Sequence, residues 1–255
     1  MAVWRVVVIV SHRVYRLGTC PWTRVGSNGM TDRSHLIGSC ASRGTAICLA
    51  VAIASLLTAC NAAPRSFDAV AETGFAVYRS GLLSDEELES LCREGVTEIV
   101  ILDGTGGKRE CAMRRRLCPQ LRVRYSHPQE ASIPLTEEFL EAFDRWVAEA
   151  RSSGSKVAFR CHHGWHRAGR LAAYYRMKFD GWSTEEAIAE MNEVGGMMWQ
   201  HPYLEPQVEA LSDLIAGRPC GQDPEYCVQP PAAGQDEGLT SEGLFVTDVC
   251  SPPAR

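Results

Sequence analysis

Cys161 and Arg167 are separated by five residues, with Gly164 between them. The apolar run Val157–Phe159 predicts a buried strand just before the cysteine, and a helical pattern begins at the arginine. A loop between a strand and a helix N-terminus can turn its backbone N–H groups toward an anion, and an arginine can donate to two phosphate oxygens. This positive environment also favours the thiolate, the nucleophilic form of cysteine. These residues therefore predict phosphate binding, with Cys161 as nucleophile.

The intervening residues are expected to supply the phosphate contacts, and Gly164 gives the loop access to positive φ. The predicted phosphate-binding residues are His162, His163, Gly164, Trp165, His166 and Arg167. Three histidines beside a cysteine also suggest zinc. Consecutive side chains diverge on a loop that wraps an anion, so we expect no metal and no cofactor. The imidazoles are instead expected to add positive character.

The loop resembles the signature loop of the cysteine-dependent protein tyrosine and dual-specificity phosphatases. Upstream, Val77-Tyr-Arg-Ser-Gly81 and Ser84-Asp-Glu-Glu-Leu88 resemble the opening strand and first helix of the small dual-specificity members, and Gly181-Trp-Ser183 resembles a later segment. The resemblance implies an α/β fold, with a central mixed, mostly parallel sheet flanked by helices on both faces. It also implies phosphomonoester hydrolysis through a cysteinyl-phosphate, without a metal. The alternation of predicted strands and helices favours the same fold class.

Two residues depart from the family pattern. Arg160 stands where the family usually has histidine, and Ala168 where it usually has serine or threonine. The missing hydroxyl helps the thiolate leave in the second step of the resembled enzymes. A module that binds phosphate without turnover is therefore an alternative function.

The general acid is not fixed by the sequence. In the resembled family it is a carboxylate on the loop before the helix that precedes the phosphate loop. Here that loop runs from Ser126 to Pro134, and Glu130 is its carboxylate. His127 in the same loop and Asp103 at the end of another predicted strand are further candidates.

The expected substrate is a phosphorylated protein, carrying phosphotyrosine or phosphoserine/threonine, or a small phosphorylated metabolite such as an inositol phosphate or a phosphoinositide. A rhodanese-like sulfurtransferase is a further alternative, because those enzymes also place a cysteine at a strand end. The net charge of −5 gives no global basic field, so we expect no nucleic-acid partner. The sequence does not indicate an oligomeric state.

The N-terminal region predicts export. Thr45–Leu57 is apolar or small and leads into Leu57-Thr-Ala-Cys60, which resembles a bacterial lipobox. We expect a leader over 1–59, a lipid-bearing Cys60 with a tether over 60–71, and attachment to a bacterial membrane at its periplasmic face or the cell surface. Translation is expected to start at Met30. The alternative is a genuine strand over 6–10.

The resembled domain is assigned to 72–217, followed by a tail rich in proline and glycine over 218–255. In an exported protein several cysteines are candidates for disulfides. They are Cys92, Cys111, Cys118, Cys220, Cys227 and Cys250. Cys111/Cys118 and Cys220/Cys227 lie close in sequence and are plausible pairs.

Overall fold

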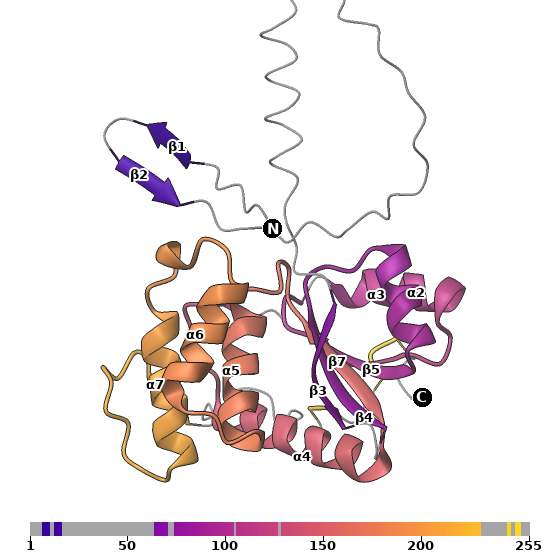
Figure 1. The fold of residues 1–255 in the computed structure, drawn as a ribbon. Helices are drawn as coiled ribbons and strands as arrows, with labels where there is room; N and C mark the ends of the chain where they lie inside the picture. The colour runs from indigo at the N-terminus through magenta and orange to yellow at the C-terminus, as the bar shows by residue number, and fades with distance from the viewer. Residues whose placement is uncertain are drawn as a thin grey trace, which may run out of the picture. The chain divides into compact units, whose positions relative to one another are not determined.

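The computed structural model divides the chain into two compact units, Met1–Cys60 and Asn61–Arg255. The structure describes residues 7–10, 13–16, 64–70, 74–104, 106–126, 129–230, 244–245 and 248–250. Within the first unit, β1 (Val7–Val10) pairs antiparallel with β2 (Arg13–Arg16) (Figure 1). This strand matches the alternative for the N-terminal segment. The start at Met30 and the lipidation of Cys60 lie outside the described residues and stay predictions.

The second unit is built on a sheet in the order β3-β4-β7-β5-β6. Its strands are β3 (Arg65–Val70), β4 (Phe75–Ser80), β5 (Val96–Ile101), β6 (Arg122–Ser126) and β7 (Lys156–Arg160). Strand β3 runs antiparallel to β4, and every other neighbouring pair is parallel. The predicted mixed, mostly parallel sheet is confirmed.

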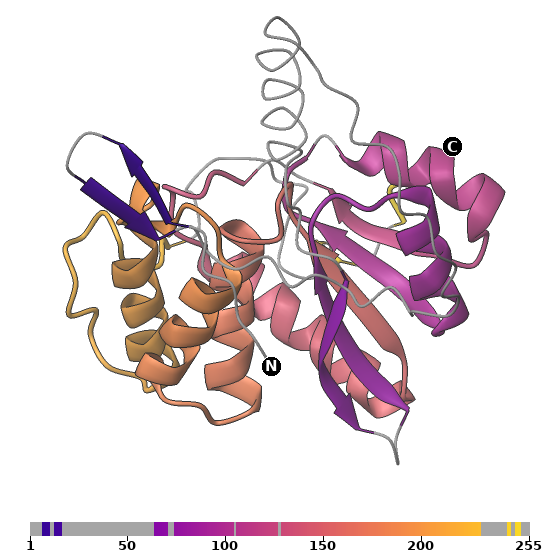
Figure 2. The same ribbon diagram turned by 45° about the horizontal axis from the view of Figure 1, so that its top comes forward.

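Helices cover both faces of this sheet (Figures 1 and 2). On one face, α2 (Asp85–Arg93) and α3 (Gly106–Leu117) pack on the side chains of Ala76, Tyr78 and their neighbours. On the other face the remaining helices enclose the larger core. These helices are α4 (Glu137–Ser153), α5 (Arg167–Phe179), α6 (Thr184–Val194) and α7 (Leu204–Ile215). Strand β7, buried from both sides, delivers the chain to the cysteine.

The helix ends follow local signals in the sequence. Ser84 and Ser183 each form a capping box with the glutamate three residues later. Thr136 accepts a hydrogen bond from the Phe139 N–H, and Gly154 ends α4 with φ of 66°. No helix in the described part of the chain is long and apolar enough to cross a bilayer.

The two ends assigned outside the domain contribute to it. The tether predicted over 60–71 contains β3, which pairs with β4 and covers that edge of the sheet. From the tail, Phe245 enters the large core, where its ring lies 5.2 Å from that of Tyr125 and 5.9 Å from that of Trp146. The domain boundaries at 72 and 217 are therefore too narrow.

The described cysteines form three disulfides. Cys220–Cys227 is paired as expected, whereas Cys92 binds Cys118 and Cys111 binds Cys250. The expected Cys111/Cys118 pair is wrong because α3 carries the chain between them. Seven residues of helix rise about 10 Å, which exceeds the Cα separation that a disulfide bridges. The Cys111–Cys250 bond fixes the end of the tail to α3.

Candidate active site

Cys161 follows the last residue of β7 and is 2% exposed. The Gly164 N–H donates to its Sγ at 3.2 Å, and Gly164 adopts φ of 75°, which an L side chain rarely takes. Among the described cysteines, Cys161 carries the free thiol. The loop therefore folds back so that its own backbone stabilises charge on the sulfur.

The loop carbonyls are held by groups outside the loop. The Leu82 N–H donates to the His162 carbonyl at 2.8 Å, and Arg79 donates from Nε to Gly164 O at 2.8 Å and from a terminal nitrogen to Trp165 O at 3.2 Å. In a trans peptide the N–H points opposite to the preceding carbonyl. Three peptide units of the loop therefore turn their N–H groups, those of His163, Trp165 and His166, away from these partners and toward the inner side of the loop.

Arg79 is a functional residue that the sequence reasoning missed. It comes from β4, beside β7 in the sheet, and is 3% exposed. The segment around it was used only for its resemblance to a family strand. Its signal in the sequence is a cation within an otherwise apolar strand, FAVYRS. Such a residue needs partners when it is buried, and here those partners are the loop carbonyls.

The N-terminus of α5 is open to an anion. His166 is the N-cap residue and its side chain makes no capping hydrogen bond, while the first turn contains no acidic residue. The unpaired N–H groups and the positive end of the helix dipole therefore face the loop. Arg167, half-buried, donates to Gln129 O at 3.1 Å. This contact places its guanidinium between the phosphate loop and the predicted acid loop.

The loop histidines form a cluster of rings. His163 stacks on Trp165 with centroids 5.1 Å apart, and the ring of His166 lies 3.7 Å from that of His201. Burial lowers the pKa of His163, and it lowers the pKa of His166 to about 4. Burial therefore favours the neutral form of both imidazoles, which runs against the expectation that these two rings add positive charge. Within the described residues, no group of three or more His, Cys, Asp or Glu is placed to hold a metal ion.

Arg160, the residue before Cys161, is paired with two buried carboxylates. Its fully buried guanidinium pairs with Asp103 and with Glu110, whose carboxylate lies 2.6 Å away. Burial raises the pKa of Glu110, and the charge of Arg160 acts against that rise. Asp103 is 7% exposed and already committed to this ion pair, which leaves it poorly placed to donate a proton to a leaving group.

Two buried side chains hold the backbone of the predicted acid loop by donating hydrogen bonds to its carbonyls. Arg170, 1% exposed, donates to Ile133 O at 2.7 Å and to Ala131 O at 3.2 Å, and Gln207 donates to Ser132 O at 3.0 Å. Burial lowers the pKa of Arg170 to about 10, so it remains a cation at neutral pH.

The acid loop contains two of the candidate general acids, Glu130 and His127. Glu130 is exposed at the start of the described part of this loop, and His127 lies outside the described residues. The assignment of Glu130 as general acid therefore stays a prediction. Ala168, in the first turn of α5, is fully buried.

Comparison with known proteins finds one short sequence match and several similar structures. No family model matches the chain. Tyrosine-protein phosphatase yvh1 of Schizosaccharomyces pombe is 38% identical over 56 residues, which cover 22% of this chain and 17% of that protein. P. aeruginosa TpbA covers 59% of this chain and 96% of its own, with 22% identity and a TM-score of 0.42. The core catalytic domain of PP-IP phosphatase SIW14 from S. cerevisiae covers 60% and 89%, with 16% identity and a TM-score of 0.42.

Proposed function

We propose that this chain hydrolyses phosphomonoesters through a cysteinyl-phosphate intermediate, in the manner of tyrosine and dual-specificity phosphatases. One observation carries the proposal: the loop carbonyls of His162, Gly164 and Trp165 are fastened from outside. The amides behind Cys161 are thereby prearranged around the position of a phosphate, and prearranged donors are worth most when charge develops in the transition state.

In the first step the Cys161 thiolate attacks phosphorus, a P–S bond forms, and the P–O bond to the leaving group breaks. The loop amides and Arg167 hold the equatorial oxygens, and a general acid, for which Glu130 is the proposal, gives a proton to the leaving oxygen. In the second step water attacks phosphorus and loses a proton. The P–S bond then breaks, releasing phosphate and restoring the thiolate.

A phosphorylated protein is the proposed substrate. His163 and His166 are neutral at neutral pH, so they do not offer the cationic rim that a polyphosphorylated inositol would require. The short segment shared with a tyrosine-protein phosphatase supports the same choice. Inositol phosphates and phosphoinositides remain the alternative to be tested with the same enzyme.

A second candidate function is phosphate binding without turnover, and Ala168 favours it. The discriminating experiment mixes the purified chain, under mild reducing conditions, with excess p-nitrophenyl phosphate and follows nitrophenolate on the millisecond scale. A burst near one equivalent with slow turnover is the expected result. Steady release that disappears in Cys161→Ser would indicate an unhindered phosphatase. No release from folded, reduced protein that still binds phosphate would favour the binding module.

The cellular placement is part of the proposal. Export, a cleaved leader, a lipid on Cys60 and attachment to a bacterial membrane are proposed from the N-terminal sequence. Three disulfides in the described residues support an oxidising compartment. Mass spectrometry of the membrane fraction tests this. A lipid-modified N-terminal peptide beginning at Cys60 is expected, and a peptide covering 3–13 in cells would contradict the start at Met30.

A further inference from the structure

The connection between α6 and α7 packs directly on the phosphate loop. The Nε2 of His166 donates to the Gly196 carbonyl at 2.9 Å, and the rings of His166 and His201 are 3.7 Å apart. The ring of Trp165 lies so close that a Cβ added at Gly196 would come within 2.4 Å of it. Anything bound against this connection therefore adjoins the catalytic loop.

This connection keeps large apolar side chains in water. Trp199, in the short 3-10 helix Met198–Gln200, is 77% exposed, and Met197 is 60% exposed. Met197 also adopts φ of 56°, the left-handed conformation that is costly for a residue other than glycine. Neither side chain is used to bury core. Strain and apolar exposure together beside a site indicate a surface that a ligand covers.

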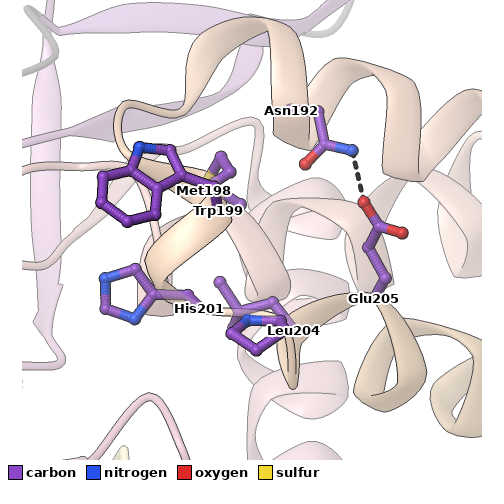
Figure 3. A pocket seen from close by; sticks show the side chains of 7 residues that line it. Asn192, Met198, Trp199, His201, Leu204 and Glu205 are labelled. Carbon is purple, nitrogen blue, oxygen red and sulfur yellow. Dashed lines mark hydrogen bonds between the residues drawn. The ribbon is translucent and has the colours of Figure 1, made fainter. Parts of the chain in front are cut away.

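A cavity of about 370 Å³ lies beside these side chains. It is lined by Asn192, Met198, Trp199, His201, Pro202, Leu204 and Glu205. In Figure 3 the pair of Asn192 and Glu205, joined by a hydrogen bond of 2.7 Å, lies across the cavity from the rings of Trp199 and His201. The walls are therefore apolar, and a carboxylate stands at one end. This volume is near the lower limit of ligand pockets and suits one large side chain rather than a whole cofactor.

The cavity and the phosphate site share a wall. His201 lines the cavity, its ring contacts that of His166 at a tilt of 37°, and it hydrogen-bonds to the Tyr203 hydroxyl. Burial raises the pKa of Tyr203, while the charges of Arg170 and Arg167 act in the opposite direction, so this hydroxyl is within electrostatic reach of the phosphate-binding arginine. A peptide whose phosphorylated residue enters the loop can therefore extend a neighbouring side chain into the cavity.

Charge selects the occupant of this cavity. Glu205 is exposed, and within the described residues no cationic side chain pairs with it. Carboxylates repel a polyphosphorylated headgroup or an anionic membrane and attract a lysine or arginine. The chemistry fits a peptide with an apolar residue and a basic residue near the phosphorylated one.

We propose that the cavity between the 3-10 helix Met198–Gln200 and α7 is a second substrate subsite, which takes an apolar side chain close to the phosphorylated residue while a basic residue of the same peptide faces Glu205. This inference rests on the proposed function, because it names the substrate class of the same site. The indole ring of Trp199 covers the apolar side chain when the peptide is bound. The subsite thus favours unfolded or extended segments of phosphoproteins over small phosphorylated metabolites.

The test measures binding and turnover separately. Phosphotyrosine peptides carrying Leu or Gly at the positions beside the phosphotyrosine, each with Arg or Glu beyond them, are titrated into full-chain Cys161→Ser and assayed for hydrolysis by the unmodified chain. The Leu/Arg peptide is expected to bind and react about tenfold better than the Gly/Glu peptide, as burial of one apolar side chain predicts. Trp199→Ala should remove most of this preference, and Glu205→Gln the part due to Arg.

Matched variants and a small substrate keep the outcomes separate. Leu214→Ala and Glu209→Gln, which lie on α7 but do not line the cavity, should leave the preference intact. Hydrolysis of p-nitrophenyl phosphate should be the same in Trp199→Ala and in the unmodified chain. If this small substrate reacts but the peptides are not distinguished, the subsite is refuted and the proposed function stands.

Two further outcomes would overturn either the proposed function or the subsite. If nothing is hydrolysed while Cys161→Ser still prefers the Leu/Arg peptide, the proposed function fails and the subsite stands. Phosphatidylcholine vesicles provide the last arm, since an exposed tryptophan also suits a bilayer surface. Vesicle binding that Trp199→Ala abolishes, with no preference among peptides, would overturn the subsite in favour of a membrane contact.

Discussion

The phosphate loop and the acid loop meet at Arg167 but are held in different ways. In the phosphate loop, the carbonyls of His162, Gly164 and Trp165 accept hydrogen bonds from β4 and the turn after it, so the backbone itself is the binding element. In the acid loop, Arg170 and Gln207 tie down the carbonyls of 131–133, while Glu130 remains exposed. One loop is fixed for binding, and the other is fixed at its base with its titratable side chain in solvent.

This difference separates two parts of the chemistry. Stabilisation of the phosphoryl group depends on buried contacts that cannot shift without cost, because buried polar groups must stay paired. Proton donation depends on a side chain that solvent reaches. Substitutions in the two loops should therefore change different observables, and five substitutions test this division, beginning with the largest expected effect.

Arg79→Met should cause the largest loss. It frees the Gly164 and Trp165 carbonyls and disorders the amides opposite them, and the loss of such donors typically costs about 100- to 1,000-fold in kcat. Inhibition by vanadate should weaken with it, which a merely structural role would not require. Circular dichroism checks that the variant is folded. An unchanged kcat in folded protein would contradict the role of Arg79.

Gly169→Ala provides a milder version of the same perturbation. A Cβ there would lie 3.0 Å from a terminal nitrogen of Arg79 and 3.1 Å from Met191, so the guanidinium must shift while its charge is kept. A loss in kcat smaller than that of Arg79→Met is expected. A larger loss would mean that α5 packing, and not the arginine, controls the loop.

Glu130→Gln tests the role of the acid loop in proton donation. Loss of a general acid typically slows the first step, cleavage of the P–O bond, by about 100-fold or more. This effect should grow as the leaving phenol becomes less acidic. Hydrolysis of p-nitrophenyl phosphate should be affected little, because its leaving group needs no proton. Glu141→Gln on the exposed side of α4 is the control. Equal losses with all leaving groups would move the acid to another residue.

Ala168→Ser should alter the second step alone. A hydroxyl in the first turn of α5 is expected to raise steady-state turnover several-fold and to reduce the burst, since breakdown of the cysteinyl-phosphate would no longer limit the rate. Rapid-mixing kinetics separate the two phases. An unchanged steady-state rate would show that the missing hydroxyl does not limit this enzyme.

His166→Gln should change how stability depends on pH, with a smaller effect on stability at neutral pH. The fold keeps His166 neutral, with its pKa at about 4 against an ordinary 6.5. As pH falls below about 6.5 the unfolded chain gains a proton that the folded chain cannot, so stability declines until pH reaches about 4. The variant should show a flatter fall of Tm over this range. Equal slopes of Tm against pH in the variant and the unmodified chain would contradict the buried, neutral state of His166.

Local patterns predicted much of the fold and the centre of the site. The capping boxes at Ser84 and Ser183, the buried strand before Cys161 and the helix after it each depend on residues within a few positions of one another. Cys161, Gly164 and Arg167 are recognisable for the same reason. Their strand, loop and helix are consecutive, so the sequence places these three residues together.

Contacts between distant segments could not be predicted in this way. Arg79 meets Gly164 across 85 residues, and Cys111 meets Cys250 across 139. Nothing in the apolar strand FAVYRS says which carbonyls its arginine will bind, because that depends on β4 lying beside β7. The proposed second subsite had no motif, because its lining comes from α6, the connection after it and the start of α7, and is recognisable only by exposure and shape.

The Cys111–Cys250 disulfide closes a covalent ring that contains the whole catalytic loop and both of the helices beside the second subsite. A protease that cuts once anywhere inside this ring produces no separate fragment, because both pieces remain joined through sulfur. Nicked molecules would therefore migrate as one species on a non-reducing gel and separate only after reduction. The bond thus keeps both pieces of a singly cut chain in one molecule.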